Sequence, residues 1–298
     1  MNLTLCQTAL ASRLVIVLLM GVLLSACEPE ATPMPVDVMI HATPEATATA
    51  LAGRSETLQY VLLPNTLNAV PDLELIQSAG SVTQMTEAAE VLPEYDIAVQ
   101  YGLADGWTVS DYLPTVALVI APENPLFENE AVIDVIRRSI DPAQVVEALG
   151  ITGAEALPAE ADASGTLRTR LANLGFPDGI ALRMGVGYVP GAAQVMAQME
   201  AANLEIQETL LTMNEIRNAF GNQQIQAALV SWTQPVERDG WVQRYGEDNV
   251  IALYTVPVSY LADADLPVSL TPGGFPVVIQ ANEGDALGTQ DASTPDGS

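Results

Sequence analysis

Residues 178–232 read DGIALRMGVGYVPGAAQVMAQMEAANLEIQETLLTMNEIRNAFGNQQIQAALVSW and alternate strand and helix patterns twice over. The apolar runs ALRMGVG, LEIQETLL and IQAALVSW predict three strands, and the two segments between them have helical patterns. The first helix is expected to end at Asn203. The second is expected to begin at Thr212, which has capping-box spacing to Glu215, and to end at Gly221. Each connection is long enough for a right-handed crossover, so the stretch predicts a βαβαβ unit with a parallel sheet.

The carboxyl ends of these strands are the first place to expect a ligand, because open sheets of this kind bind ligands there. Aromatic residues at such ends offer flat apolar area with a polar tip. The alternative for each is a partly buried packing residue. The strand ends and the loops after them give these candidate ligand-binding residues: Asn65, Tyr101, Trp107, Tyr188, Ser231, Trp232 and Thr233.

Outward from this unit, the α/β pattern continues toward the N-terminus. TLQYVLLP (57–64), DIAVQYG (96–102) and TVALVIAP (115–122) predict strands, and the last two are apolar enough to be covered on both faces. Pro71 and Gly80 are suited to the start and the stop of a helix. The segments EAVIDVIRRSI and DPAQVVEALG predict two more helices that are separated near Asp141 and Pro142. The fold class is therefore α/β.

The inventory of reactive side chains excludes several kinds of chemistry. All ten cationic Lys and Arg residues are arginines, the single histidine is His41, and the net charge is −27 at pH 7. Lysine Schiff bases, P-loop phosphate binding, histidine-based acyl transfer and Cys/His zinc sites therefore lack their parts. Nucleic acid is a poor partner for so acidic a surface. Binding is the default expectation, without catalysis and without a cofactor.

The N-terminal segment has the layout of a secretory signal. A polar lead with Arg13 precedes an apolar run from Leu14 to Leu24, which is shorter than the roughly 20 residues of a membrane-spanning helix. The tetrad LSAC, ending at Cys27, resembles the lipobox of bacterial lipoproteins, in which the cysteine is acylated. The alternatives are an ordinary signal cleaved nearby and a permanent transmembrane anchor. We expect a signal peptide over 1–26, a lipidated Cys27, and a location on the extracytoplasmic face of the cell membrane.

Composition divides the rest of the chain into a core and two flanking segments. Residues 27–55 are rich in Pro, Ala, Thr and Glu and predict a flexible tether, and residues 283–298 predict a disordered tail. The block between them is apolar enough to build a large core.

Several segments, in order, resemble extracellular solute-binding proteins of family 5, the peptide, oligopeptide and nickel receptors of ABC importers. They are NPLFENEAVIDVIRRSIDPAQVVEALG from Asn124, the turn GFPDG at 175–179, the run from Ala192 to the tryptophan of ALVSW, and NVIALYTVPVSYLADADLPVSLTPGGFP from Asn249. The likeness covers about residues 122–276. It implies a periplasmic-binding-protein-like type II fold, with two lobes of mainly parallel sheets and a hinge. Lobe I would be 57–121 plus 250–282, and lobe II would be 122–249.

The leading functional interpretation is a lipid-anchored substrate-binding component of an ABC importer, which captures a small solute between its lobes and delivers it to a permease. Peptide-like solutes are among the candidates. A second interpretation is a degenerate binding-protein fold that serves as an interaction or scaffold lipoprotein at the cell surface. A third is a carboxylate-based hydrolase using a pair such as Asp105 and Asp111, although acidic residues are so abundant that chance proximity is expected.

Overall fold

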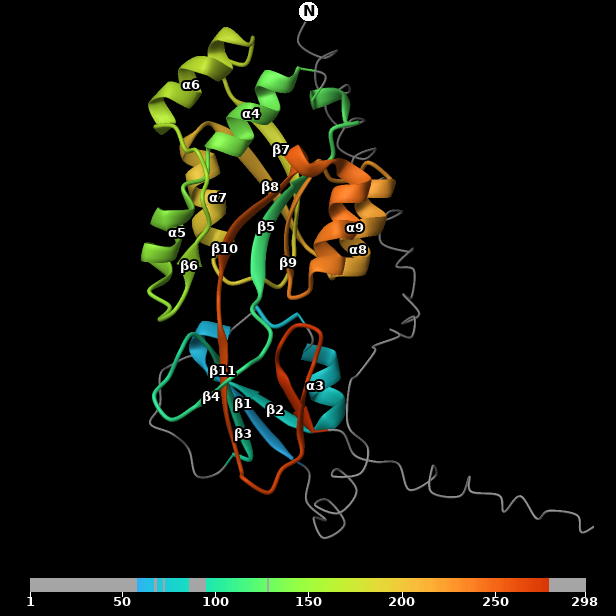
Figure 1. Cartoon of the computed structure of the whole chain (residues 1–298). Coiled ribbons are helices and arrows are strands. Elements are labelled where there is room, and N and C mark those ends of the chain that lie inside the picture. The colour runs from blue at the N-terminus through green and yellow to red at the C-terminus, as the bar shows by residue number, and fades with distance from the viewer. Residues whose placement is uncertain (1–57, 67–68, 72, 86–94, 128, 279–298) are drawn as a thin grey trace, which may run out of the picture. The chain divides into compact units, whose positions relative to one another are not determined.

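The computed structural model describes residues 58–66, 69–71, 73–85, 95–127 and 129–278. The predicted signal peptide, Cys27, the tether and the C-terminal tail lie outside these residues. Within the described part, strands and helices alternate along the chain and the strands form two main sheets and one small hairpin (Figure 1). The α/β prediction is therefore confirmed. No described helix is both long enough and apolar enough to cross a membrane.

The first sheet has five strands in the order β2-β1-β3-β11-β4. Their bounds are β1 Gln59–Leu62, β2 Ser81–Gln84, β3 Ile97–Tyr101, β4 Thr108–Val109 and β11 Val258–Ala262. Helix α3 (Leu73–Ala79) joins β1 to β2, starting close after Pro71 and ending just before Gly80, as the sequence predicted. The hairpin of β12 (Val268–Leu270) and β13 (Pro276–Val278) is tied to this sheet, because the Val278 N–H donates to the Tyr60 hydroxyl at 3.0 Å.

The second sheet has six strands in the order β6-β10-β5-β9-β7-β8. Their bounds are β5 Thr115–Ile120, β6 Glu155–Ala156, β7 Ile180–Val186, β8 Leu204–Leu210, β9 Ala227–Trp232 and β10 Val250–Thr255. Strand β7 pairs in parallel with both β8 and β9, and α7 (Ala192–Ala201) and α8 (Met213–Gly221) form the connections. The predicted βαβαβ unit is confirmed.

Helices cover both faces of the second sheet (Figure 1). Alternate residues of β5 and β9 enter two different cores. Val116, Leu118 and Leu229 belong to the core shared with α4 (Glu130–Arg138), α5 (Pro142–Leu149), α6 (Ser164–Asn173) and α7. Ala117 and Val230 belong to the core shared with α8 and α9 (Pro235–Tyr245). This period of two, with both faces covered, explains why these strands read as continuous apolar runs.

Helix boundaries follow the predicted capping residues. The Thr212 hydroxyl caps the Glu215 N–H, and the Glu215 carboxylate caps the Thr212 N–H, which confirms the capping box. Asn203 adopts a φ of 73°, as expected of a residue that ends a helix in the left-handed region. Asp141 and Gly150 cap the two ends of α5. The 3-10 turns are η1 Pro64–Thr66, η2 Pro125–Phe127 and η3 Glu247–Asn249.

Two features of the predicted lobes need correction. Strands β5 and β10, which the sequence interpretation placed in the first lobe, pair with each other and with β9 and β6 in the second sheet. The sheets are also mixed, not mainly parallel. Parallel pairs occur where a helical crossover joins the strands, as in the βαβαβ unit. Strands β5 and β11 follow the two connections that run between the sheets, and they pair antiparallel to their neighbours. Strand β10 follows α9 within the second sheet and also pairs antiparallel with its neighbours.

Replacing Asp141 with alanine is expected to lower the free energy of unfolding by about 1 kcal/mol, the usual loss for an N-cap carboxylate. Asp141 Oδ1 accepts hydrogen bonds from the backbone N–H groups of Ala143 at 3.0 Å and Gln144 at 3.3 Å. Chemical denaturation of the purified protein measures the loss. Asp141→Asn is the control, because its amide oxygen still accepts these bonds. An equal loss in both variants would contradict the capping role.

Candidate functional site

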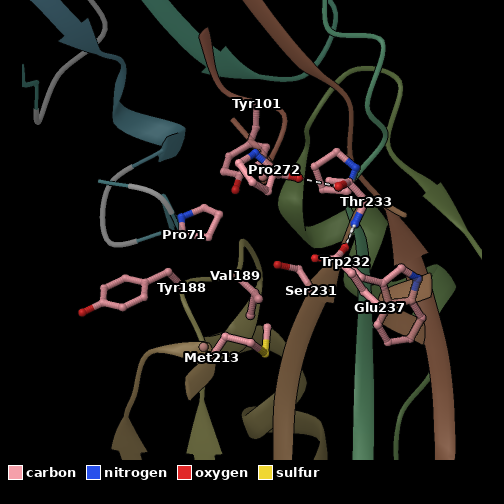
Figure 2. Close-up of a pocket in the computed structure, with 13 residues that line it drawn as sticks. Pro71, Tyr101, Tyr188, Val189, Met213, Ser231, Trp232, Thr233, Glu237 and Pro272 are labelled. Carbon is pink, nitrogen blue, oxygen red and sulfur yellow. Dashed lines mark hydrogen bonds between the residues drawn. The ribbon is translucent and has the colours of Figure 1, made fainter. Parts of the chain in front are cut away.

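A cavity of about 120 Å³ lies where the carboxyl ends of β3, β7 and β9 meet. Both sheets and the loops attached to them contribute to its walls (Figure 2). The first sheet and its hairpin supply Pro71, Tyr101, Pro114, Pro272 and Gly273; the second sheet supplies Gly187, Tyr188, Val189, Met213, Ser231, Trp232, Thr233 and Glu237. The cavity therefore lies at strand ends that the sequence marked as candidate ligand-binding positions.

Five of the seven candidate residues line this cavity, namely Tyr101, Tyr188, Ser231, Trp232 and Thr233. Asn65 does not line it. Its side-chain amide instead forms two hydrogen bonds with the backbone at the end of β3. It donates to the Tyr101 carbonyl at 2.6 Å and accepts from the Tyr101 N–H at 3.2 Å. Trp107 does not line the cavity either. It is half-buried in the loop before β4, where its backbone N–H donates to the Ala104 carbonyl at 3.2 Å.

Tyr101 is held rigidly at the first-sheet side of the cavity. Its side chain is buried, its hydroxyl donates to the Ala69 carbonyl at 2.5 Å, and its ring meets the edge of Phe275 with ring centroids 5.5 Å apart. The hydroxyl is thus already used within the protein. Tyr101 therefore offers a fixed apolar wall in place of the polar tip that the sequence suggested.

Trp232 contributes less to the cavity than its position suggested. The side chain is only 7% exposed and belongs to the core cluster that includes Phe220, Trp241 and Tyr245. In Figure 2 the indole extends away from Tyr188 and Pro71. The apolar surface of Trp232 therefore mainly stabilises the packing of α8 and α9 on the sheet.

The loop after β7 forms the opposite wall. It is fixed at both ends, because the Gly187 N–H donates to the Leu229 carbonyl at 2.8 Å and the Tyr254 hydroxyl donates to the Pro190 carbonyl at 2.6 Å. Burial raises the pKa of Tyr254, so this hydroxyl stays protonated and remains a donor. Tyr188 is half-buried on this anchored loop, with Val189 beside it.

Thr233 and Glu237 form a polar corner where β9 leads into α9. The Glu237 carboxylate accepts from the Thr233 N–H at 2.9 Å and from the Gln234 N–H at 3.2 Å. The Thr233 hydroxyl donates to the carbonyl of Pro272, which lies in the hairpin loop of the first sheet, and Figure 2 shows both contacts as dashed lines. A hydrogen bond thus joins the two sides of the cavity directly.

Glu237 was missed by the sequence interpretation, because α9 itself was not predicted. The available signal was the sequence SWTQPVE, in which Pro235 stands at a first helical position and Glu237 comes three residues after the N-cap Gln234. Met213 and Pro272 were missed for a different reason, since nothing local marks them as neighbours of the strand ends. Among the described residues no group of three or more His, Cys, Asp or Glu side chains is placed to hold a metal ion.

Comparisons with known proteins give similarity to solved structures only. No protein-family model matches the chain, and no curated protein matches it in sequence. One similar structure is MoaA, described as a PBP/SBP, from A. tumefaciens R10 in complex with mannopinic acid; it is 12% identical over 63% of this chain and 55% of that chain, with a TM-score of 0.48.

Two further solved structures are similar to the chain. The dipeptide-binding protein from Pseudoalteromonas sp. SM9913, in complex with Met-Leu, is 12% identical over 62% of this chain and 50% of that chain, with a TM-score of 0.44. NikA from Brucella suis, in complex with Fe(III)-EDTA, is 11% identical over 57% of this chain and 53% of that chain, with a TM-score of 0.42. The matches thus span about half the length of each of these proteins.

Proposed function

We propose that this protein is the lipid-anchored substrate-binding component of an ABC importer, which captures a small solute between two lobes and passes it to a membrane permease. The observation that carries the proposal is the cavity at the carboxyl ends of β3, β7 and β9, with walls from both sheets. The family-5 motifs in the sequence support it. A solute at this place would contact both halves at once, which is the requirement for closure on a ligand.

The lining supports binding in preference to catalysis. It combines apolar walls from proline, valine, methionine and tyrosine side chains with two hydroxyl residues, Ser231 and Thr233, and the carboxylate of Glu237. Such a lining matches ligand sites, where a few polar groups orient a ligand on a mostly apolar surface.

The hinge of the proposed receptor would lie in the two connections that run between the sheets, 110–115 and 255–258. They are hydrogen-bonded side by side, since the Val256 N–H donates to the Pro114 carbonyl at 2.9 Å and the Ser110 N–H donates to the Val258 carbonyl at 2.8 Å. Because β5 and β10 pair within the second sheet, we propose these segments, in place of the boundaries near 121 and 250, as the place where lobes I and II would separate. Rotation about a few loop residues at both crossings would open the cavity.

Ligand capture predicts a rise in melting temperature with at least one solute class. We expect a shift of several degrees when the purified protein is heated with its ligand at about 100 times the dissociation constant, since this stabilises the folded state by about 2.7 kcal/mol. The measurement is a thermal-shift screen against peptides, amino acids, sugars, nickel chelates, anions and small amines.

The same screen separates the receptor from the scaffold lipoprotein. A solute that raises the melting temperature in a concentration-dependent manner supports capture. A flat result across all classes at millimolar concentration contradicts the receptor, and the surface scaffold then becomes the better interpretation. Turnover of a solute during the screen would instead favour an enzyme.

A further inference from the structure

The cavity wall contains one charged side chain among its thirteen lining residues, Glu237. The side chain is half-buried, and a single oxygen, Oε2, accepts both backbone hydrogen bonds from Thr233 and Gln234. Among the described residues no donor hydrogen-bonds to the other oxygen, Oε1. Because an ionised carboxylate has about four acceptor positions, Glu237 keeps capacity for a further donor.

No described arginine neutralises Glu237. The arginines of the described part have other partners. Three form ion pairs: Arg138 and Arg170 with Asp134 and Asp162, and Arg238 with Glu247. The others donate to backbone carbonyls (Arg137, Arg168 and Arg183) or lie over aromatic rings (Arg217 and Arg244). Even Arg238, the next residue in the chain, forms its ion pairs away from the cavity. An anionic ligand would therefore meet a carboxylate in the described lining and no cationic side chain.

Helix N-termini near the cavity do not reverse this charge. Met213 lies in the first turn of α8, and Glu237 lies in the first turn of α9. Each N-terminus carries about half a positive charge, which is smaller than the full negative charge of one carboxylate. Each first turn also has its own glutamate, since Glu215 accepts from the Thr212 N–H at 2.7 Å just as Glu237 caps α9. The local balance is therefore negative, and the net charge of −27 acts in the same direction.

The size of the cavity, which is partly open to solvent, is a second indication of the ligand class. An apolar cavity of about 150 Å³ holds benzene, whereas sites for drug-sized ligands are about 300–1,000 Å³. A cavity of about 120 Å³ therefore fits a molecule of roughly half a dozen non-hydrogen atoms. Its walls at Tyr101, Val189 and Met213 suit an apolar body.

From charge and size together we infer that the ligand is a small organic cation, an amine with a short apolar body, whose ammonium group lies beside the Glu237 carboxylate. This inference rests on the proposed function, because it specifies the class of solute that the receptor captures. The apolar body lies against the wall formed by Tyr101, Val189 and Met213. The carboxylate contributes a charge-assisted hydrogen bond in a partly desolvated place, where such bonds are strong.

Three probes with one four-carbon chain test the charge preference: 1-butylammonium, 1-butanol and butyrate. Each is titrated into the purified full-length protein and followed by ligand-observed NMR. We expect 1-butylammonium to bind at least ten times more tightly than 1-butanol, and butyrate not to bind. Glu237→Gln is expected to weaken 1-butylammonium binding at least tenfold and to leave 1-butanol binding within twofold. The glutamine oxygen can still accept the N–H groups of Thr233 and Gln234, so the helix cap is retained.

Glu200→Gln is the matched control. Glu200 is exposed on α7 and does not line the cavity. Its replacement changes the net charge by the same amount as Glu237→Gln, so this variant is expected to bind the probes like the unaltered protein. Equal binding of the three probes, or equal losses in the two variants, overturns the inference. If none of the three probes binds while another solute stabilises the protein in the thermal screen, the cation site is wrong and the receptor stands. If no solute of any class binds, the receptor itself is overturned.

Discussion

Gly179→Ala is expected to lower the free energy of unfolding by about 3 kcal/mol, from a left-handed backbone and an overpacked contact together. Gly179 has a φ of 91°, and a β-carbon built there would lie 2.2 Å from the Asn203 carbonyl oxygen and 2.8 Å from Asn203 Nδ2. That carbonyl accepts the Ile180 N–H at 3.1 Å, the bond at which β7 begins to pair with β8. The added methyl group would therefore push β7 and the edge strand β8 apart where their ladder starts.

Gly175→Ala separates the two causes. Gly175 belongs to the same GFPDG turn and has a φ of 96°, but no atom lies within 4 Å of its would-be β-carbon. This variant has only the backbone strain, so its expected loss is about 1 kcal/mol. Urea denaturation of the unaltered protein and both variants measures the difference. Equal losses would show that the contact with Asn203 adds nothing.

Local signals predicted the βαβαβ unit of the second sheet well. The turn at Gly179, the left-handed Asn203 and the capping box at Thr212 each concern a few neighbouring residues, so the chain's own chemistry decides them. Strand positions followed from apolar runs for the same reason. The boundaries agree with the expected segments to within a few residues, which is the ordinary uncertainty of element ends.

Local signals did not predict which strands pair with each other, or in which direction. Strands β5 and β10 are apolar on both faces, and a run of this kind fits between neighbours in either sheet and in either direction. Only contacts distant in sequence select the partner, such as Val116 against Ser231. Helix α6 was missed because only Leu167 and Leu171 are buried along it, so its helical pattern is weak.

The candidate site shows the same division between local and distant information. The rule that ligands bind at strand ends placed five residues around one cavity, but it could not tell which side chains face inward. Asn65 follows β1 closely yet holds the backbone of Tyr101, and Trp232 ends β9 yet packs into a core. Glu237, the charged member, stands on a helix and not at a strand end.

Tyr254→Ala is expected to lower the free energy of unfolding by about 3–5 kcal/mol, as for other large buried aromatic side chains. Tyr254 is fully buried on β10, between its partners on β5 and β6. Its hydroxyl donates to the Pro190 carbonyl and lies so close to Gly191 that a β-carbon there would be 2.5 Å away. Tyr254 thus fixes the loop that carries Tyr188 and Val189 into the cavity wall.

Tyr254→Phe isolates the hydrogen bond from the packing. It keeps the ring but leaves the buried Pro190 carbonyl without its donor, which costs about 1–3 kcal/mol. Because the loop then loses its anchor, we also expect weaker capture of whichever solute stabilises the protein. Tyr260→Phe is the control: no described residue hydrogen-bonds to the Tyr260 hydroxyl, so its expected change is within about 0.5 kcal/mol. Chemical denaturation of the three tyrosine variants measures their free energies of unfolding, and thermal-shift titration measures their solute binding. If Tyr254→Phe is as stable as Tyr260→Phe and binds solute normally, Tyr254 is only a packing residue and the loop is held by its other contacts.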